Sequence, residues 1–411
     1  MLRALRLPAL VCLLCVTAAC SQSALPERAG RSAEVVAAPA PTPAPRAVAA
    51  SAAGESIDFA GLVSTLSEPD ASFFSENYIS NETSYLQIAP ALERSARPGG
   101  VYLGVGPEQN FSYIALTRPE LAFVVDIRRE NMLLHLLYRA VFDEATSRSH
   151  FVALLLGRPW SAESAPPADA SVDQVLAHAT RSPPSDATLA ETHARLRARI
   201  LDAYGVKLDA GDLESLAAAH RAFHKGQLEL RFELHDKNGR QYPTLRELLS
   251  RTDADGRSAG FLASEPSFRF VQRLEREGRI VPVVGDFAGE RALPGIAAWL
   301  REHRLEVSTF YVSNVEQYLF EPGMWARWSR NLAALPVHEE SLLVRCWLDQ
   351  GRRHPAQMKG HRTATTLHRM APFVERQRTR PSPSWWAVAT EDVFAPLPAQ
   401  PTGARTARAA D

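Results

Sequence analysis

The chain has 411 residues, and hydrophobic residue types make up 45% of it, which is enough for one large domain or two of medium size. Its 46 basic and 46 acidic side chains give a net charge of zero, so we expect no nucleic-acid partner drawn by a basic field. Three of the four cysteines lie within the first 20 residues, which argues against a disulfide framework in the folded part.

Residues 1–20 are typical of a secretory signal. Two arginines precede an apolar stretch at 7–16, and small residues then lead to Cys20. A run of small residues that ends at a cysteine resembles a bacterial lipobox. It predicts an exported lipoprotein anchored to a membrane by lipid on Cys20, and Ser21 favours the outer membrane. If this interpretation of the signal is wrong, a cytoplasmic location is expected.

Five segments are expected after the signal. They are a disordered linker rich in alanine and proline at 21–55, the first half of a sheet domain at 56–144, a mainly helical capping insertion at 145–260, the second half of the sheet domain at 261–390, and a disordered tail at 391–411.

Apolar runs and helical periodicities alternate on both sides of the insertion. The pattern predicts strands at 101–103, 121–125, 280–284, 307–312 and 341–348. It predicts helices at 109–116, 131–141, 189–203, 213–223, 265–277, 294–303 and 324–335. This alternation predicts a three-layer Rossmann-like α/β fold, with helices on both faces of a mostly parallel sheet. Ligands of such sheets bind at the carboxyl ends of the strands.

A glycine-rich turn follows the first predicted strand. Gly104 is expected to adopt backbone angles closed to other residues, and Gly106 to let a ligand approach without meeting a Cβ. Pro107 and Gln109 begin a helix whose free N–H groups can bind a ligand. Asp126 ends the next strand 20 residues after Gly106, where a carboxylate can accept hydrogen bonds from ribose hydroxyls. The alternative is a glycine hairpin followed by an unrelated buried strand.

Polar residues before this turn allow two interpretations. Asn81 either caps a helix over 83–92, or it belongs with Glu82 and Tyr85 to a lid that faces the glycine turn. We also expect residues 232–242 of the insertion to lie near that turn, because the insertion leaves the sheet and returns to it.

The sequence resembles class I S-adenosylmethionine-dependent methyltransferases. Within that superfamily it resembles a poorly characterised bacterial group with the runs VYLGVGPEQNFSYIA, VVDIRREN, VPVVGDF and FYVSNVEQYLF. The resemblance covers residues 57–141 and 261–348 and implies S-adenosylmethionine as the cofactor. It implies that Gly104 and Gly106 lie under the methionine moiety, Asp126 holds the ribose, Asp286 and Phe287 flank the adenine, and Asn314 faces the methyl group as the catalytic candidate.

Three departures from that pattern keep two functions open. Tyr102 replaces the usual acidic residue before the turn, Pro107 and Glu108 replace its third glycine, and the fourth strand ends in SNVEQY where amino-group methyltransferases have NPPY. Asn314 could equally cap the next helix. The chain is therefore either a methyltransferase of unknown acceptor or a non-catalytic Rossmann-like lipoprotein that binds a small-molecule ligand or a partner at the cell envelope.

Other chemistries lack their motifs. The sequence has no GxSxG elbow and no GxxxxGK phosphate loop. His220 and His224 lack the glutamate of a zinc motif, so we expect a surface pair and no metal. His354, His361 and His368 recur among arginines and are expected on a solvated face.

Overall fold

The structure is a computed structural model that describes residues 57–69, 77–232 and 241–395. These residues belong to one compact unit, Ala49–Asp411. The predicted signal with Cys20, the linker and most of the tail lie outside the described residues. Within the described ranges, no helix is both long enough and apolar enough to cross a membrane.

The described part is a mixed α/β fold built on a six-stranded, mostly parallel sheet. The strands are β1 (Val101–Gly104), β2 (Leu121–Asp126), β3 (Ile280–Val284), β4 (Val307–Ser313), β5 (Val337–Leu348) and β6 (Thr363–Arg369). Their order across the sheet is β3-β2-β1-β4-β5-β6. The first five run parallel to their neighbours, and β6 is antiparallel to β5. The predicted strands are confirmed, and so is the mostly parallel sheet.

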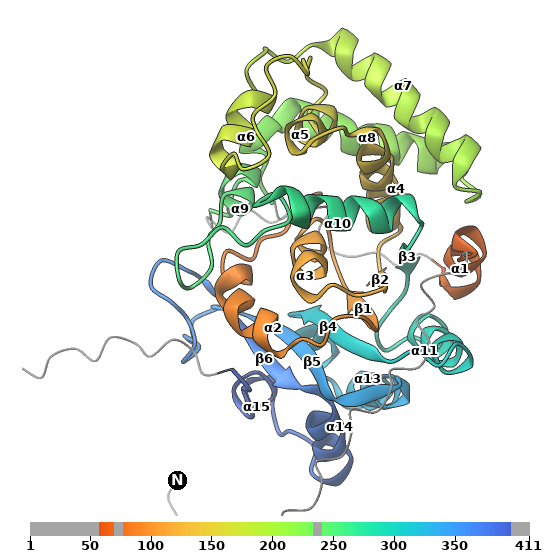
Figure 1. Cartoon of the computed structure of the whole chain (residues 1–411). Helices are drawn as coiled ribbons and strands as arrows, with labels where there is room; N and C mark the ends of the chain where they lie inside the picture. The colour runs from red at the N-terminus through yellow and green to blue at the C-terminus, as the bar shows by residue number, and fades with distance from the viewer. Residues whose placement is uncertain (1–56, 70–76, 233–240, 396–411) are drawn as a thin grey trace, which may run out of the picture. The chain divides into compact units, whose positions relative to one another are not determined.

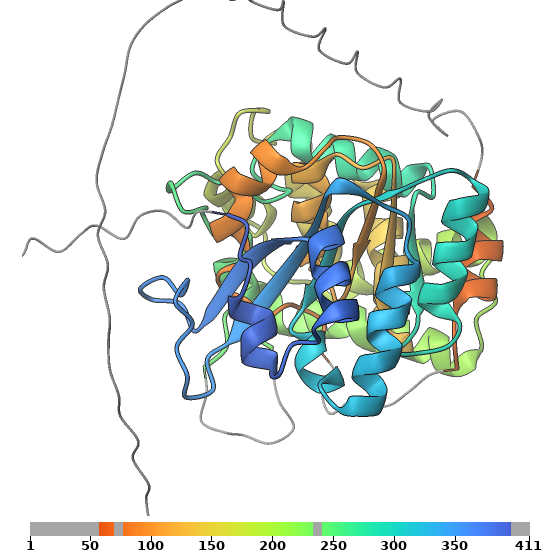
Figure 2. The ribbon, with the colours of Figure 1, turned by 90° about the horizontal axis from the view of Figure 1, so that it is seen from below.

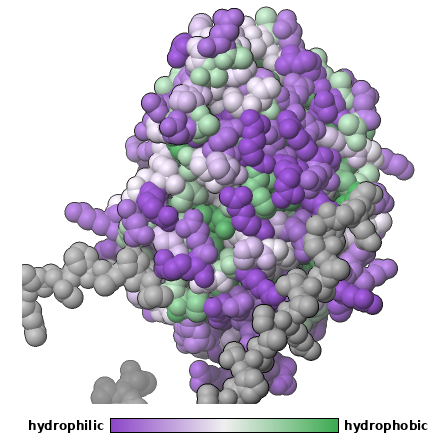
Figure 3. Space-filling view, viewed as in Figure 1, coloured by the Kyte–Doolittle hydropathy of each residue, from purple (hydrophilic) through white to green (hydrophobic). Residues whose placement is uncertain are grey.

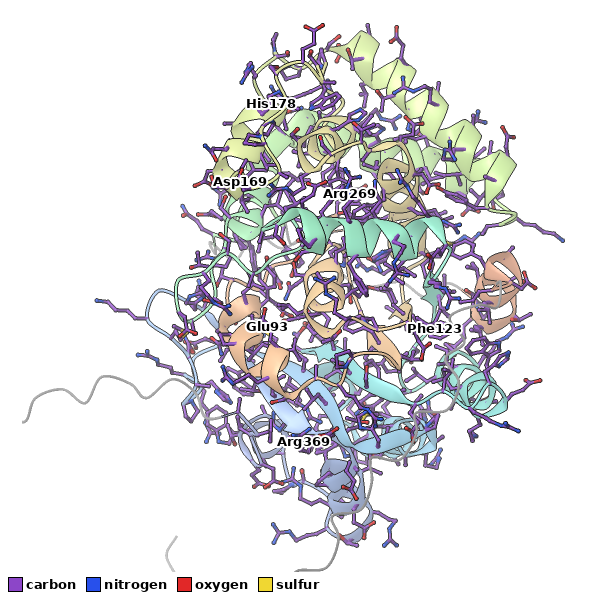
Figure 4. All side chains as sticks on the ribbon, in the orientation of Figure 1. Glu93, Phe123, Asp169, His178, Arg269 and Arg369 are labelled. Atoms are coloured by element: carbon purple, nitrogen blue, oxygen red, sulfur yellow. The ribbon has the colours of Figure 1, made fainter. Side chains whose placement is uncertain are left out.

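The central strands are apolar runs because both of their faces are covered. Every residue of β1, β2 and β3 is buried, as expected for parallel strands between helices. Phe123 of β2, labelled in Figure 4, contacts Trp299 with ring centroids 5.9 Å apart. The face seen in Figure 3 is mostly hydrophilic, with small hydrophobic areas between the polar side chains.

Helices from both halves of the sheet domain pack around the strands. They are α1 (Phe59–Leu66), η1 (Tyr85–Ile88), α2 (Ala89–Ser95), α3 (Gln109–Thr117), α4 (Arg129–Glu144), α10 (Glu265–Arg276), α11 (Ala292–Glu302), α12 (Val315–Leu319), α13 (Pro322–Ala334), α14 (Met370–Thr379) and α15 (Trp385–Thr390). Helix α4 contacts β2 and β3, and α14 contacts β5. Seen from below, α13 and α14 lie in front of the strands (Figure 2).

The segment between α4 and α10 is mainly helical. It contains α5 (Arg148–Leu155), α6 (Val172–Ala179), α7 (Asp186–Ala203), α8 (Ala210–Gly226), η2 (Gln227–Glu229) and α9 (Leu245–Leu249). Helices α5, α7 and α8 contact α4 and lie beyond it from the sheet (Figure 1). The insertion therefore buries its apolar faces against α4 as well as within itself.

Two predictions about histidines are wrong. His220 is fully buried, and its Nε2 lies 3.0 Å from the Leu154 carbonyl oxygen, so it joins α8 to α5 where we expected a surface pair. His354 and His368 are buried at the β6 end of the sheet, where we expected a solvated face. His368 belongs to β6, whose polar residues are typical of a surface segment. They are buried because β6 pairs along β5 and contacts η1.

Candidate ligand-binding site

A cavity of about 540 Å³ lies at the carboxyl ends of β1, β2, β3 and β4. The end of each of these strands contributes to its wall, as ligand sites of open α/β sheets do. Among the predicted site residues, the wall includes Gly106, Pro107, Gln109, Asp126, Asp286, Phe287, Asn314, Asn81 and Glu82. Gly104 and Tyr85 do not line the cavity.

The structure changes the role predicted for Gly104 and agrees with the one predicted for Gly106. Gly104 ends β1 without a left-handed φ, and a Cβ there would lie 1.9 Å from Oδ1 of Asn110. This glycine therefore makes room for Asn110, where we expected an unusual backbone conformation. Gly106 has the positive φ, +78°, and a Cβ there would meet no atom within 4 Å. The ligand-facing role predicted for Gly106 agrees with that open space.

Three side chains hold the carbonyl of Gly106 in place. It accepts hydrogen bonds from Nδ2 of Asn110 at 2.9 Å and Nδ2 of Asn131 at 3.2 Å, and Nε2 of His135 lies 2.9 Å away. Burial lowers the pKa of His135 to about 4, so its ring is neutral at pH 7. Because a carbonyl only accepts, Nε2 must carry the proton. Helix α4 thus fixes the glycine loop through neutral donors.

Asp126 is paired with a residue that the sequence analysis did not select. Its Oδ1 accepts hydrogen bonds from the backbone N–H of Arg128 at 2.9 Å and from Nε of Arg128 at 3.1 Å. Its Oδ2 accepts from the same guanidinium at 3.2 Å. Both side chains are mostly buried and both line the cavity. A ribose at this position would share Asp126 with Arg128.

The end of β3 forms the opposite wall. Oδ1 of Asp286 accepts a hydrogen bond from the N–H of Ala288 at 2.8 Å, which shapes a tight turn. The ring of Phe287 stacks on Trp328 with centroids 5.3 Å apart. Phe287 lines the cavity beside Asp286, and Trp328 supports its ring from the protein interior.

The end of β4 brings Asn314 to the cavity wall. Ser313 has a left-handed φ of +54°, which is uncommon outside glycine. Asn314 stands at the N-cap position of α12, but its side chain makes no capping hydrogen bond. Asn314 therefore takes the position that the capping alternative expected, without the side-chain hydrogen bond of a cap. Oδ1 of Asn314 instead accepts a hydrogen bond from the hydroxyl of Ser313 at 3.2 Å.

Glu82 is a buried carboxyl group in the cavity wall. Only 1% of it is exposed. One oxygen bonds the hydroxyl of Ser313, and the other accepts from Nε2 of Gln109 at 3.1 Å. Burial raises the pKa of Glu82, and the groups that oppose this shift are hydrogen-bond partners such as Ser313 and Tyr311, with no cation among them. A buried carboxyl whose pKa is raised is a candidate for proton transfer at the site.

The segment before the glycine loop packs on the start of α3. Both carboxylate oxygens of Glu108 accept the backbone N–H of Ser80 at 3.2 Å. Asn81 lines the cavity, and Ser84 stands at the N-cap of η1, so the helix-cap interpretation of Asn81 is wrong. Tyr85 is buried and donates its hydroxyl to the carbonyl of Leu248 at 2.9 Å, away from the cavity, which is why its lid assignment is wrong.

The insertion also reaches the cavity. Phe232 and Tyr242 line it together with Gly106, and their ring centroids lie 4.9 Å apart. These are the two ends of the range predicted to lie near the glycine turn, and residues 233–240 lie outside the described residues.

Several wall residues were not predicted from the sequence. They are Ser80, Arg128, Tyr311, Ser313, Tyr318 and Met324. For Arg128 a signal was available, because a cation two residues beyond a strand-end carboxylate can fold back on it. In the described part of the chain, no group of three or more histidine, cysteine, aspartate and glutamate side chains is arranged to hold a metal ion.

Comparison with known proteins gives one family. A family model described as a domain of unknown function, DUF7790, matches residues 78–392. The chain belongs to this family. The matched region contains every described residue of the cavity wall except Asn77. No curated protein matches the chain.

Proposed function

We propose that this DUF7790 chain is a three-layer Rossmann-like protein that binds S-adenosylmethionine in the strand-end cavity and transfers its methyl group. One observation carries the proposal: a single cavity joins the glycine loop after β1, Asp126 after β2, Phe287 after β3 and Asn314 after β4. The strand order β3-β2-β1-β4-β5-β6 supports it, because nucleotides bind across such sheets at this edge.

The residues present fit the cofactor. Gly106 leaves open space where a Cβ would be, Phe287 offers a flat apolar face, and the volume of about 540 Å³ lies within the usual range for small-molecule sites. Asp126 already accepts three hydrogen bonds from Arg128. Because a carboxylate has about four lone-pair sites, about one site stays open to a ribose hydroxyl. The cofactor would supply an activated methyl group.

The residues around Asn314 would position the acceptor and take its proton. An acceptor O–H or N–H loses a proton when it is methylated, and Ser313 joins Glu82 to Asn314 through hydrogen bonds of its hydroxyl. Burial raises the pKa of Glu82 above that of an exposed glutamate, which makes this carboxylate a stronger base for that proton. Asn314 would orient the acceptor, and positioning would provide most of the rate.

Calorimetric titration of S-adenosylmethionine tests the cofactor. We expect binding to wild type, and binding 10- to 100-fold weaker to Asp126→Ala, because a charge-assisted hydrogen bond is worth about 1.5–3 kcal/mol. Asp126→Asn keeps the shape and one acceptor, so it separates loss of charge from collapse of the Arg128 pair. Asp169→Ala, on the exposed surface, is the matched control. Absence of heat with wild type rejects the cofactor.

A second candidate is a non-catalytic binding lipoprotein of the cell envelope. The Asp126–Arg128 pair favours it, because the ribose partner is already engaged, and so does the signal-like start of the sequence. S-adenosylmethionine is made in the cytoplasm, so an exported chain would meet a different ligand. Mass spectrometry of ligand that co-purifies with the chain separates the two: the cofactor or its demethylated product supports the methyltransferase, and any other bound metabolite supports the binding protein.

Location is tested with Cys20→Ala. The proposed lipid anchor predicts that the full chain fractionates with membranes and that the variant is released from them. Full-length protein found wholly in the cytosol, with or without the substitution, contradicts the anchor and strengthens the methyltransferase.

A further inference from the structure

A second pocket, of about 230 Å³, adjoins the strand-end cavity. The two share Asn81, Tyr242 and Leu348 in their walls. One side of the second pocket comes from the insertion, through Arg231 and Arg251, and the other comes from the segment between β5 and β6. A ligand in the cavity can therefore extend between two parts of the chain that are far apart in sequence.

The second pocket is lined by more basic than acidic side chains. Arg231, Arg251 and Arg362 line it, and we call these three residues the arginine annex. None of the three takes part in an ion pair within the described residues. Arg231 donates to the carbonyl of Tyr242 at 2.6 Å, which directs its guanidinium along the pocket wall.

The acidic residues of the same pocket already have donors. Glu247 accepts the N–H of Thr244 at 2.7 Å as part of a helix cap. Asp349 accepts from the N–H of Gly351 at 3.0 Å and from Nε2 of Gln357 at 3.2 Å. These carboxylates serve local structure, and neither neutralises an arginine of the annex.

Arg251 carries a buried donor without an acceptor. It is half-buried, and its Nε has no hydrogen-bond partner among the described residues. Buried polar atoms are almost always satisfied, so this orphaned Nε shows that no described residue accepts from that side of the guanidinium. Asn81 and Thr83, in the same wall, offer neutral polar groups beside it.

We propose that the arginine annex binds an anionic group of the phosphate type, carried by the ligand or acceptor that occupies the cavity. Guanidinium forks match the oxygens of phosphate in geometry and charge, and three of them suit a dianion. This inference rests on the cavity being the ligand site of the proposed function, but it does not require S-adenosylmethionine to be that ligand.

Titration of inorganic phosphate into the full chain, at ionic strength held constant with chloride, tests the annex. We expect saturable binding to wild type that weakens about tenfold or more in Arg251→Gln and in Arg362→Gln, since each removes a charge-assisted contact. Arg246→Gln is the matched control, because it lowers the charge of the neighbouring helix α9 equally but lies outside both pockets. Equal phosphate affinity in all four proteins, or none in wild type, overturns the annex.

Two further titrations separate its ligand from the cofactor. Glycerol 3-phosphate and vesicles that contain phosphatidylglycerol distinguish a soluble phosphate ester from a lipid headgroup, and annex-dependent binding of either one supports the proposal. S-adenosylmethionine affinity should be unchanged in Arg251→Gln. If the chain binds phosphate but not S-adenosylmethionine, the proposal for the arginine annex stands and the proposed cofactor is rejected. If it binds S-adenosylmethionine but not phosphate, only the proposal for the annex is rejected.

Discussion

Glu108 provides a test of the electrostatics at the start of α3. The residue is 6% exposed, and its two carboxylate oxygens share the backbone N–H of Ser80. Burial is the main reason that the pKa of Glu108 rises from 4.5 to about 7, and the nearby carboxyl of Glu82 adds to the shift. The folded chain therefore binds a proton at Glu108 that the unfolded chain has released between those two pH values.

The sign of the effect on stability follows from this proton. Since the folded state holds more protons than the unfolded state, the free energy of unfolding falls as the pH rises from about 4.5 to 7, and the loss is complete above that range. Each pKa unit corresponds to about 1.4 kcal/mol. Between pH 5 and pH 8, Glu108 alone should lower the free energy of unfolding by about 2–3 kcal/mol.

Glu108→Gln removes this titration and keeps an oxygen for Ser80. Urea unfolding of wild type and variant at pH 5 and pH 8 measures it. From pH 5 to pH 8, the free energy of unfolding of Glu108→Gln should rise by about 2–3 kcal/mol relative to that of wild type. For the control Glu163→Gln, at an exposed position, we expect no such change relative to wild type. If wild type and Glu108→Gln differ in free energy of unfolding by the same amount at pH 5 and at pH 8, burial does not raise the pKa of Glu108 and the argument is refuted.

Two other substitutions test the core and the glycine loop. Glu316→Gln breaks a buried ion pair in which Arg345 donates to Glu316 at 2.5 and 2.9 Å. It should lower the free energy of unfolding in urea by about 3–5 kcal/mol. The control Glu214→Gln breaks an exposed pair with Arg221 and should lower it by less than about 1 kcal/mol. Comparable costs for both would contradict the burial of the first pair. Gly106 and Gly256 have φ of +78° and +79°, and each has open space at its Cβ position. Substitution of either one by alanine should therefore lower the free energy of unfolding by the same amount, about 1–2 kcal/mol. Only Gly106→Ala should weaken S-adenosylmethionine binding in calorimetry. Equal affinity in both variants would place the ligand elsewhere.

The alternation of strands and helices could be predicted because it is written in local patterns. Buried parallel strands such as β2 and β3 are continuous apolar runs, and α7 and α8 show helical periodicity. Strand β6 carries no such signal. Its threonines are buried because Ser84, from a distant segment, hydrogen-bonds Thr363 and Thr365 at 2.7 and 2.9 Å.

The candidate site shows the same division. Strand-end residues such as Asp126 and Asn314 could be placed at one edge because a parallel sheet brings its carboxyl ends together. Three features depend on side-chain packing, which one sequence does not reveal. They are the pairing of Asp126 with Arg128, the buried environment of Glu82 and the close approach of Asn110 to Gly104.

Hydrogen–deuterium exchange, with and without S-adenosylmethionine, tests the central claim that the strand-end cavity is the ligand site. Binding there should slow exchange in peptides that cover 105–110, 126–131, 285–289 and 313–316, and leave β6 unchanged, because ligand contacts suppress local opening. No protection at saturating ligand, or protection confined to segments away from the cavity, would contradict the account.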